Sequence, residues 1–416
     1  MTSLMGAGLR RGHLYALVFV IVLLPSPAHV VLVDDPHSYF QVAPRLSDLP
    51  LAALLALSLP ATIVALRRRA LGATGTLAAA LLALVAVALV AHPSWQGLQT
   101  LFRLAGATAA AVAFARLSAP RERRLVLVAL ALTALTQTAL ALAQLAVGDL
   151  LVAYEHDPLI TVGPFIRPAG TLPNGFVLAG LALVAATALA RPAVSARGAG
   201  LLAWSGAIAL AVAPVGVVFS RAAALGAALA ATALAPGALR STGARVALAA
   251  FVAGAALPAL AVAEGWAARS GEFPATASGD LRLALIAQTL PLVAEDPLLG
   301  VGPGRAVPAL RELEARAPGS VVRFQPAHSV PFVVALEAGI PAAIASVALL
   351  AALAVSAWRR GPEALAVHLA LLPYLLLDNY LWTSAPGMLL LGLWAGAQEG
   401  SSASSTSMTG MPSRTG

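Results

Sequence analysis

The stretch GATGTLAAALLALVAVALVA, residues 72–91, contains no charged side chain over 20 residues. A helix of about 20 apolar residues is long enough to cross the hydrocarbon core of a bilayer. The whole 416-residue chain has the same character, with 59% hydrophobic and only 11% charged residues. Average soluble domains carry about 25% charged residues, so this chain has too few charges to cover a water-facing surface. The sequence therefore predicts a protein whose solvent is a membrane.

Eleven further stretches have a similar length and character, which predicts an all-α polytopic membrane protein with about twelve transmembrane helices. The first stretch follows Arg10 and Arg11, as a signal peptide would. No small-residue cleavage site follows it, so we interpret it as a retained helix. The twelve predicted spans are residues 14–33, 50–66, 72–91, 98–115, 125–147, 174–190, 199–219, 222–239, 245–264, 330–357, 364–381 and 384–397.

The arginines between these spans predict the orientation. All 26 basic residues are arginine, and with the high alanine content this indicates a GC-rich bacterial genome. Counted from an internal N-terminus, the alternate loops hold most arginines, whereas the short outer loops hold little beyond Arg45 and Arg167. We therefore expect a bundle over residues 1–397 in a bacterial plasma membrane, with both termini cytoplasmic. The Ser/Thr/Gly-rich residues 398–416 are expected to form a disordered cytoplasmic tail.

One outer loop, residues 265–329 between the ninth and tenth spans, is far longer than an ordinary connection of about 4–6 residues. We expect it to form an external lid inserted in the bundle. Its first helix should begin at Ser278 or Asp280, lie in the membrane interface and be interrupted by Pro291. GVGPG lacks the Gly-Lys-Ser/Thr ending of a phosphate loop, so it predicts a backbone turn. PALRELEARAPG then predicts a short charged helix.

Two classes of site are excluded by composition. The chain has no cysteine, so neither a disulfide framework nor a thiolate metal site is available. Its net charge of +8 would suit a nucleic acid partner, but the arginines are scattered between apolar runs and form no aromatic-rich patch. We therefore expect no nucleic acid partner.

Four stretches together resemble the O-antigen ligase and O-antigen polymerase-like family of membrane glycosyltransferases. They follow the order found in that family, and the long loop also lies between spans nine and ten. Ser329 stands where the family often has Asn, and GTLPN at 170–174 is a slightly altered element. The stretches are FIRPAGTLPNGFVLAG (165–180), VVFSRAAALGAAL (217–229), SGDLRLALIAQTLPLVAEDPLLGVGPG (278–304) and AHSVPFVVALEAGI (327–340).

The resemblance implies a bundle like that of C-type glycosyltransferases and a metal-independent, inverting transfer without a cofactor. The donor would be a glycan on a polyprenyl diphosphate such as undecaprenyl diphosphate. The acceptor would be a hydroxyl of a glycolipid or glycan on the outer face, which in ligases belongs to lipopolysaccharide core. Membrane lipids would be the other partners. A polysaccharide polymerase of the same family fits the motifs equally well.

Such a transfer needs a base for the acceptor's proton and positive charge for the leaving diphosphate. The resemblance assigns the base to His328, whose imidazole has an ordinary pKa near 6.5. It assigns the diphosphate to Arg221 and Arg282, because guanidinium groups match phosphate oxygens. Residues of second rank for the site are Arg167, Asn174, Arg305 and Glu337.

Two acidic residues in spans are functional candidates by default. On one continuous helix Glu337 would lie about 900° after His328, on the opposite face, so we do not expect it to orient that ring. Asp378 we interpret as a charge near the outer end of the eleventh span.

Two rival functions remain open at this stage. Asp34 and Asp35, in the first outer loop, are typical of an acid-dependent C-type glycosyltransferase. A secondary transporter would also have about twelve spans, but it would place ionisable groups near the bilayer midplane on symmetric halves. Here the charges gather at the outer edge and no repeat is visible.

Overall fold

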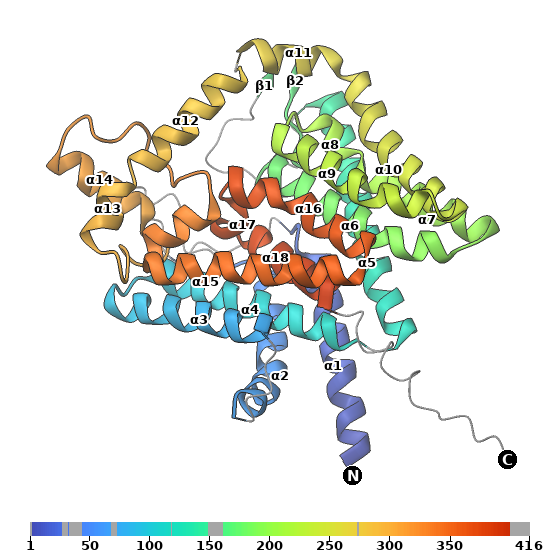
Figure 1. Ribbon diagram of the computed structural model, residues 1–416, viewed down its shortest axis with the longest axis horizontal. Helices are drawn as coiled ribbons and strands as arrows, with labels where there is room; N and C mark the ends of the chain where they lie inside the picture. The colour runs from blue at the N-terminus through green and yellow to red at the C-terminus, as the bar shows by residue number, and fades with distance from the viewer. Residues whose placement is uncertain are drawn as a thin grey trace.

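The computed structural model describes residues 2–26, 32, 44–67, 73–117, 119–148, 161–272 and 274–399. Within these ranges the chain is almost entirely helical, and its strands are one pair of two residues each (Figure 1). The predicted residues Asp34 and Asp35, and nearly all of the predicted tail 398–416, lie outside the described residues. The last helix reaches Glu399, slightly further than the boundary predicted for the bundle.

Eight helical stretches of the described chain are long and apolar enough to cross a membrane. The prediction of an all-α polytopic membrane protein is therefore confirmed. The eight are α3 (Ala73–Ala91), α4 (Trp95–Arg116), α5 (Pro120–Val147), α6 (Gly175–Ser195), α7 with α8 (Gly198–Val212, Pro214–Val217), α9 (Arg221–Ala238), α10 (Thr242–Ala261) and α15 (Val330–Arg360).

The other four predicted spans coincide with helices whose apolar described stretch is shorter, 10–17 residues, so the count of twelve stays a prediction. They are α1 (Thr2–Leu23), α2 (Asp48–Arg67), α16 (Pro362–Leu377) and α18 (Ala385–Glu399), and a single-turn helix, α17 (Tyr380–Thr383), precedes α18. Helix α1 ends about ten residues before the predicted end of the first span, at a Pro-Ser-Pro sequence that cannot continue a helix.

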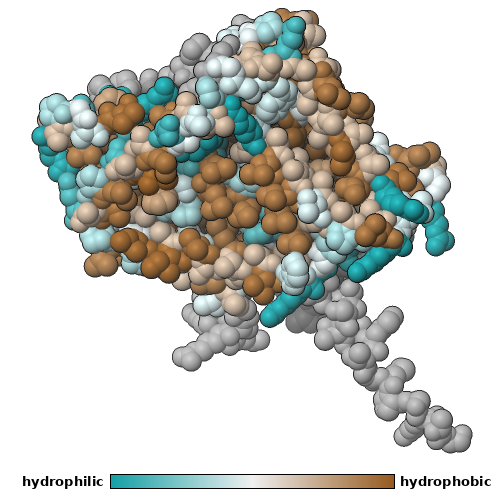
Figure 2. Space-filling view, turned by 45° about the horizontal axis from the view of Figure 1, so that its top comes forward, coloured by the Kyte–Doolittle hydropathy of each residue, from teal (hydrophilic) through white to brown (hydrophobic). Residues whose placement is uncertain are grey.

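The helices pack through small residues, as expected where lipid removes the hydrophobic drive for helix association. A Cβ on Gly226 of α9 would lie 2.3 Å from the carbonyl oxygen of Ala370 on α16. A Cβ on Gly392 of α18 would lie 2.3 Å from the carbonyl oxygen of Ala107 on α4. Helix α6 is buried along most of its length and forms the centre of the bundle. Apolar side chains face outward over the spans, for example Leu202 and Val90, and Figure 2 shows the broad hydrophobic face that results.

The segment after α10 forms an arm along one side of the bundle (Figure 1). It contains α11 (Ala263–Glu272), α12 (Ala275–Ala287), α13 (Leu290–Glu295) and α14 (Ala306–Arg316). The predicted charged helix is thus present as α14. The predicted start at Ser278 or Asp280 is wrong, because α12 begins at Ala275 after Pro274. The apolar run is interrupted as predicted, since α12 ends at Ala287 and α13 begins at Leu290, directly before Pro291. Pro291 lies in the first turn of α13, where a missing N–H costs nothing.

A break in α15 joins this arm to the bundle. Gly339 has φ 84°, outside the helical region, so the helix loses its regular hydrogen bonds there. The turn 296–304 replaces them: Val301 N–H donates to the Leu336 carbonyl at 2.8 Å, and Ile340 N–H donates to the Pro297 carbonyl at 2.8 Å. The Gly302 N–H donates to the Glu337 carbonyl at 3.1 Å. The GVGPG sequence is therefore a turn, as predicted, and its backbone is bound to a broken helix.

Candidate functional site

His328 lies directly before α15, two residues ahead of the helix start. Ser329 is the N-cap and Pro331 occupies the first turn, which fixes the direction in which the chain enters the helix. The imidazole is partly buried. Burial, reinforced by the positive charges of Arg282 and Arg323, lowers the pKa of His328 from 6.5 to about 4. At neutral pH the ring is therefore uncharged, with one nitrogen free to accept a proton.

Arg282 reaches this region from the middle of α12. Its Nε donates to the Leu377 carbonyl at 3.0 Å and its Nη1 to the Ser278 hydroxyl at 2.6 Å. Burial lowers the pKa of Arg282, opposed by the charge of Asp378 and assisted by that of Arg221. Arg282 thus lies within range of both His328 and Arg221.

Arg221 is the first residue of α9, held in place by an unusual turn. Phe219 has φ 51°, a conformation that costs a bulky residue about 1–2 kcal/mol. It is buried, packing on Phe165 at 6.0 Å and on Trp266 at 5.8 Å between ring centroids. Ser220 then caps the helix by accepting from the Ala223 N–H at 3.1 Å. Arg221 Nη2 donates to the Arg269 carbonyl on α11 at 3.4 Å.

Arg167 is the most buried arginine of the predicted set, only 8% exposed. It follows an antiparallel hairpin of β1 (Thr161–Val162) and β2 (Phe165–Ile166), which the sequence did not predict. Its guanidinium lies 4.0 Å from the centroid of Phe176, and its Nε donates to the Val218 carbonyl at 2.7 Å. Burial lowers its pKa to about 10. Within the described part of the chain, the buried Nη2 has no hydrogen-bond partner, so a donor remains for a ligand.

Asp378, which the sequence left as a boundary charge, is buried in this cluster. It follows α16, and its Oδ1 accepts from the backbone N–H groups of Asn379 at 2.7 Å and Tyr380 at 3.2 Å. Burial raises its pKa to about 6, opposed by these bonds and by the charges of Arg282 and Arg167. The Asp378 carboxylate partly balances the positive charges of the buried Arg167 and the partly exposed Arg282. The signal for it was the acidic residue in LLLDNYLW, next to an apolar helix.

Three other residues predicted for the site make structural contacts elsewhere. Asn174 caps α6, its Oδ1 accepting from the Val177 N–H at 2.9 Å. Arg305 pairs with Glu312 on α14 at 3.5 Å, where Arg305 is partly exposed and Glu312 is well exposed. The Glu337 carboxylate accepts from Trp382 Nε1 at 3.1 Å and from the backbone of Gly304 and Ala306. It therefore faces the turn 296–304 and not His328, as the helical spacing predicts.

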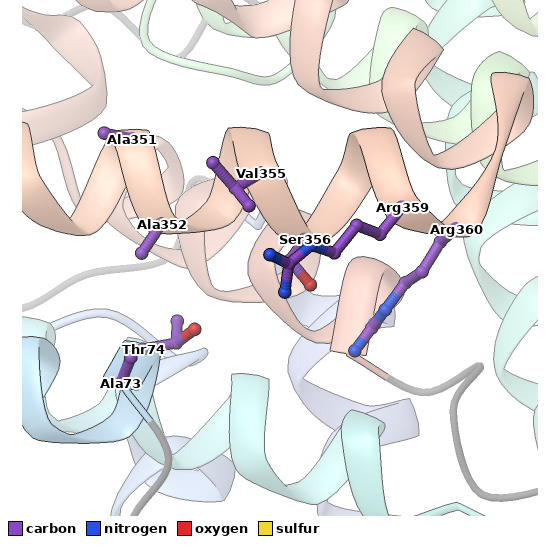
Figure 3. A pocket seen from close by; sticks show the side chains of 8 residues that line it. All are labelled: Ala73, Thr74, Ala351, Ala352, Val355, Ser356, Arg359 and Arg360. Carbon is purple, nitrogen blue, oxygen red and sulfur yellow. The ribbon is translucent and has the colours of Figure 1, made fainter. Parts of the chain in front are cut away.

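A cavity of about 540 Å³ lies well away from this cluster, between the start of α3 and the end of α15 (Figure 3). Arg359 and Arg360 line it with Thr74 and apolar side chains. The 31 residues of α15 separate it from His328 by roughly 40 Å along the helix. The cavity thus belongs to the other end of the bundle and not to the candidate site.

The cluster combines groups that suit one kind of chemistry. A neutral imidazole can accept a proton, and nearby guanidinium groups can bind a dianionic leaving group. Among the described residues, no group of three or more His, Asp or Glu side chains is arranged to hold a metal ion. The arrangement suits acid–base chemistry on an anionic substrate.

The comparison with known families bears on the same part of the chain. Residues 174–347 match the family model described as O-antigen ligase. No curated protein matches the chain. The matched range contains Arg221, Arg282 and His328, together with the broken helix and its turn, whereas Arg167 and Asp378 lie outside it. Residues 174–347 of this polytopic membrane protein are therefore similar to the O-antigen ligase family.

Proposed function

We propose that this protein is a membrane glycosyltransferase that moves a glycan from a polyprenyl diphosphate to an acceptor hydroxyl on the non-cytoplasmic face. The observation that carries the proposal is the position of Arg282, which interacts electrostatically with both His328 and Arg221 in the family-matched segment. His328 takes the proton of the acceptor hydroxyl while the hydroxyl oxygen forms a bond to the anomeric carbon of the donor glycan. The bond between that carbon and the diphosphate oxygen breaks, and the lipid diphosphate leaves on the opposite face, so the anomeric configuration inverts.

The arginines bind the diphosphate and stabilise the charge that develops on it. Arg221 and Arg282 come from different elements, α9 and α12, so they can contact different phosphate oxygens. Arg167 is a third ligand, because it keeps a buried donor and its guanidinium is held over the ring of Phe176. No metal is required in this mechanism, so transfer should persist in a chelator.

Mass spectrometry of surface glycans from a deletion strain tests the proposal. The acceptor is a glycolipid or glycan in the cell envelope. Loss of the protein should cause the lipid-linked donor to accumulate. Accumulated long polymer would identify a ligase and single repeats a polymerase, which is the alternative within the same family. Unchanged surface glycan and lipid-linked pools would overturn the proposal. Uptake of a solute into proteoliposomes would instead indicate a transporter.

Arg221→Gln and Arg282→Gln should each lower kcat/KM for the lipid-linked donor about 10- to 100-fold. This is the loss expected when one charged hydrogen bond of about 1.5–3 kcal/mol is removed. Arg359→Gln is the matched control, because Arg359 lies at the distant cavity of Figure 3 and is exposed. A steady-state transfer assay measures the effect. Equal activity in all three variants would contradict the assignment of the diphosphate to these arginines.

The pH profile should report the lowered pKa of His328. The ring is neutral above about pH 5 and is protonated only as the pH falls through about 4. Because kcat/KM reports the free enzyme, it should be flat between about pH 8 and pH 5 as far as this ring is concerned. In the donor complex the diphosphate charge raises the pKa of the ring. The acid limb of kcat should therefore lie at higher pH than that of kcat/KM.

Two variants separate the groups that can contribute to this profile. Asp378, whose pKa is raised to about 6 by burial, can add a limb of its own. Such a limb should disappear in Asp378→Asn. Arg282→Gln removes a positive charge beside the imidazole, so the remaining limb should move to higher pH. An acid limb in the pH profile of kcat/KM near pH 6.5 that is unchanged by both substitutions would contradict the role of His328.

A further inference from the structure

The residues that lead into His328 are held by two buried amide side chains from separate parts of the fold. The segment 322–327 has no regular secondary structure of its own, so its backbone groups need partners from elsewhere. Gln288, directly after α12, contacts the first part of this segment. Asn379, in the turn after α16, contacts its end. Both side chains are only 4% exposed.

Gln288 binds the first half of the segment with both ends of its amide. Its Oε1 accepts from the N–H groups of Val322 at 2.9 Å and Arg323 at 3.3 Å. Its Nε2 donates to the carbonyl groups of Arg323 at 2.8 Å and Gln325 at 3.2 Å. The amide thus takes part in four contacts with one stretch of backbone. Arg282 lies six residues before Gln288, within α12.

Asn379 binds the last two residues before the histidine. Its Nδ2 donates to the carbonyl groups of Pro326 at 3.2 Å and Ala327 at 3.1 Å. Ala327 is fully buried in the main core, so this end of the segment is anchored by packing as well. The residue before Asn379 is Asp378, whose charge interacts with Arg282. The elements that hold the segment are therefore those that carry the charged groups around His328.

We propose that Gln288 and Asn379 are positioning residues, two amide clamps that hold the segment 322–327 and thereby fix His328 relative to Arg282. The inference rests on the proposed role of His328 as the base. A base must lie about 2.6–3.2 Å from the proton it takes, and a misplacement of about 1 Å can cost about 100-fold in rate. The clamps supply this precision to a residue that precedes its helix and is not held by helical hydrogen bonds.

The test uses Gln288→Met and Asn379→Leu, which keep a similar side-chain volume and remove the hydrogen bonds. Thr138→Val is the matched control. It removes a buried hydrogen bond to the Leu210 carbonyl, between α5 and α7, away from the cluster. The full-length proteins are compared in lipid nanodiscs. Thermal melting identifies the variants that are folded.

The first readout is the rate at which diethyl pyrocarbonate modifies His328, followed by peptide mass spectrometry. Releasing the segment should raise this rate at least fivefold in either clamp variant and leave it unchanged in Thr138→Val. His92 in the same digest is the internal reference. The second readout is glycan transfer in the complemented deletion strain, which should fall about 10- to 100-fold in the clamp variants. Wild-type modification and transfer in folded clamp variants would overturn the inference.

Hydrogen exchange on the wild-type protein covers the case in which the variants do not fold. The Val322 and Arg323 amides bonded to Gln288 should exchange more slowly than their irregular backbone alone would give. Exchange as fast as in unbonded linkers would overturn the clamp. A different result would overturn the proposed function itself. If His328→Ala fully restored glycan transfer in the deletion strain, His328 would not be the base, independently of the results for the clamp variants.

Discussion

His328→Ala should reduce glycan transfer by about 100- to 10,000-fold, the usual contribution of one positioned general base. The substitution should leave the fold intact. The ring is partly buried and uncharged, and it stands before α15 and not within it, so no helical hydrogen bond depends on it. The expected variant is therefore folded, binds donor and does not transfer.

The measurement is a single-turnover assay with purified lipid-linked donor, beside a donor-binding assay on the same preparation. His328→Gln is the informative second variant, because an amide keeps hydrogen bonding but cannot take a proton at neutral pH. It should be as inactive as the alanine variant. His13→Ala, on α1, is the control and should retain full activity. Wild-type turnover by His328→Ala would remove the imidazole from the mechanism.

Gly339→Ala should destabilise the protein by about 2–5 kcal/mol, combining the cost of a left-handed conformation with that of overpacking. Gly339 has φ 84°, and a Cβ there would lie 2.2 Å from the Leu298 carbonyl oxygen. That oxygen belongs to backbone, so it cannot turn away as a flexible side chain would. The turn 296–304 would have to leave the broken helix, and the hydrogen bonds that it makes there would be lost.

Thermal melting and limited trypsin digestion measure this effect together. The melting temperature should fall by several degrees, and cleavage after Arg305, at the end of the turn, should become faster. Gly279→Ala is the matched control, since Gly279 lies within α12 with no atom within 4 Å of a built Cβ. Alanine should be neutral or slightly stabilising there. Equal melting of both variants would mean that the turn does not depend on Gly339.

The spans were predictable because a stretch of about 20 apolar residues has few alternatives in a membrane protein. The predicted stretch 98–115 corresponds to α4, and 222–239 corresponds to α9 within a residue at each end. The break at Gly339 was not predicted, because it depends on hydrogen bonds from a turn some 40 residues earlier. The pattern of apolar residues in the sequence carries no information about such distant hydrogen-bond partners.

The candidate site was predictable only in part, for a related reason. The motifs pointed to His328, Arg221 and Arg282, and the fold places Arg282 within range of both of the others. Gln288 and Asn379 carried no signal, since a buried amide that holds backbone looks like any polar residue in sequence. Glu337 was suspected because it is acidic and in a span, yet its partners are Trp382 and the turn 296–304. Long-range partners decide such roles.

The attachment of the turn 296–304 to α15 is made by main-chain atoms, and this has an evolutionary consequence. Main-chain pairing is indifferent to side-chain identity, so exposed positions such as Leu298 can vary without weakening it. Only positions with no room for a side chain are constrained: a Cβ on Gly300 or Gly339 would lie less than 2.5 Å from a backbone oxygen. We therefore expect the outer surface of this arm to vary in composition between related proteins. The main-chain contacts that attach the arm to the bundle should stay the same.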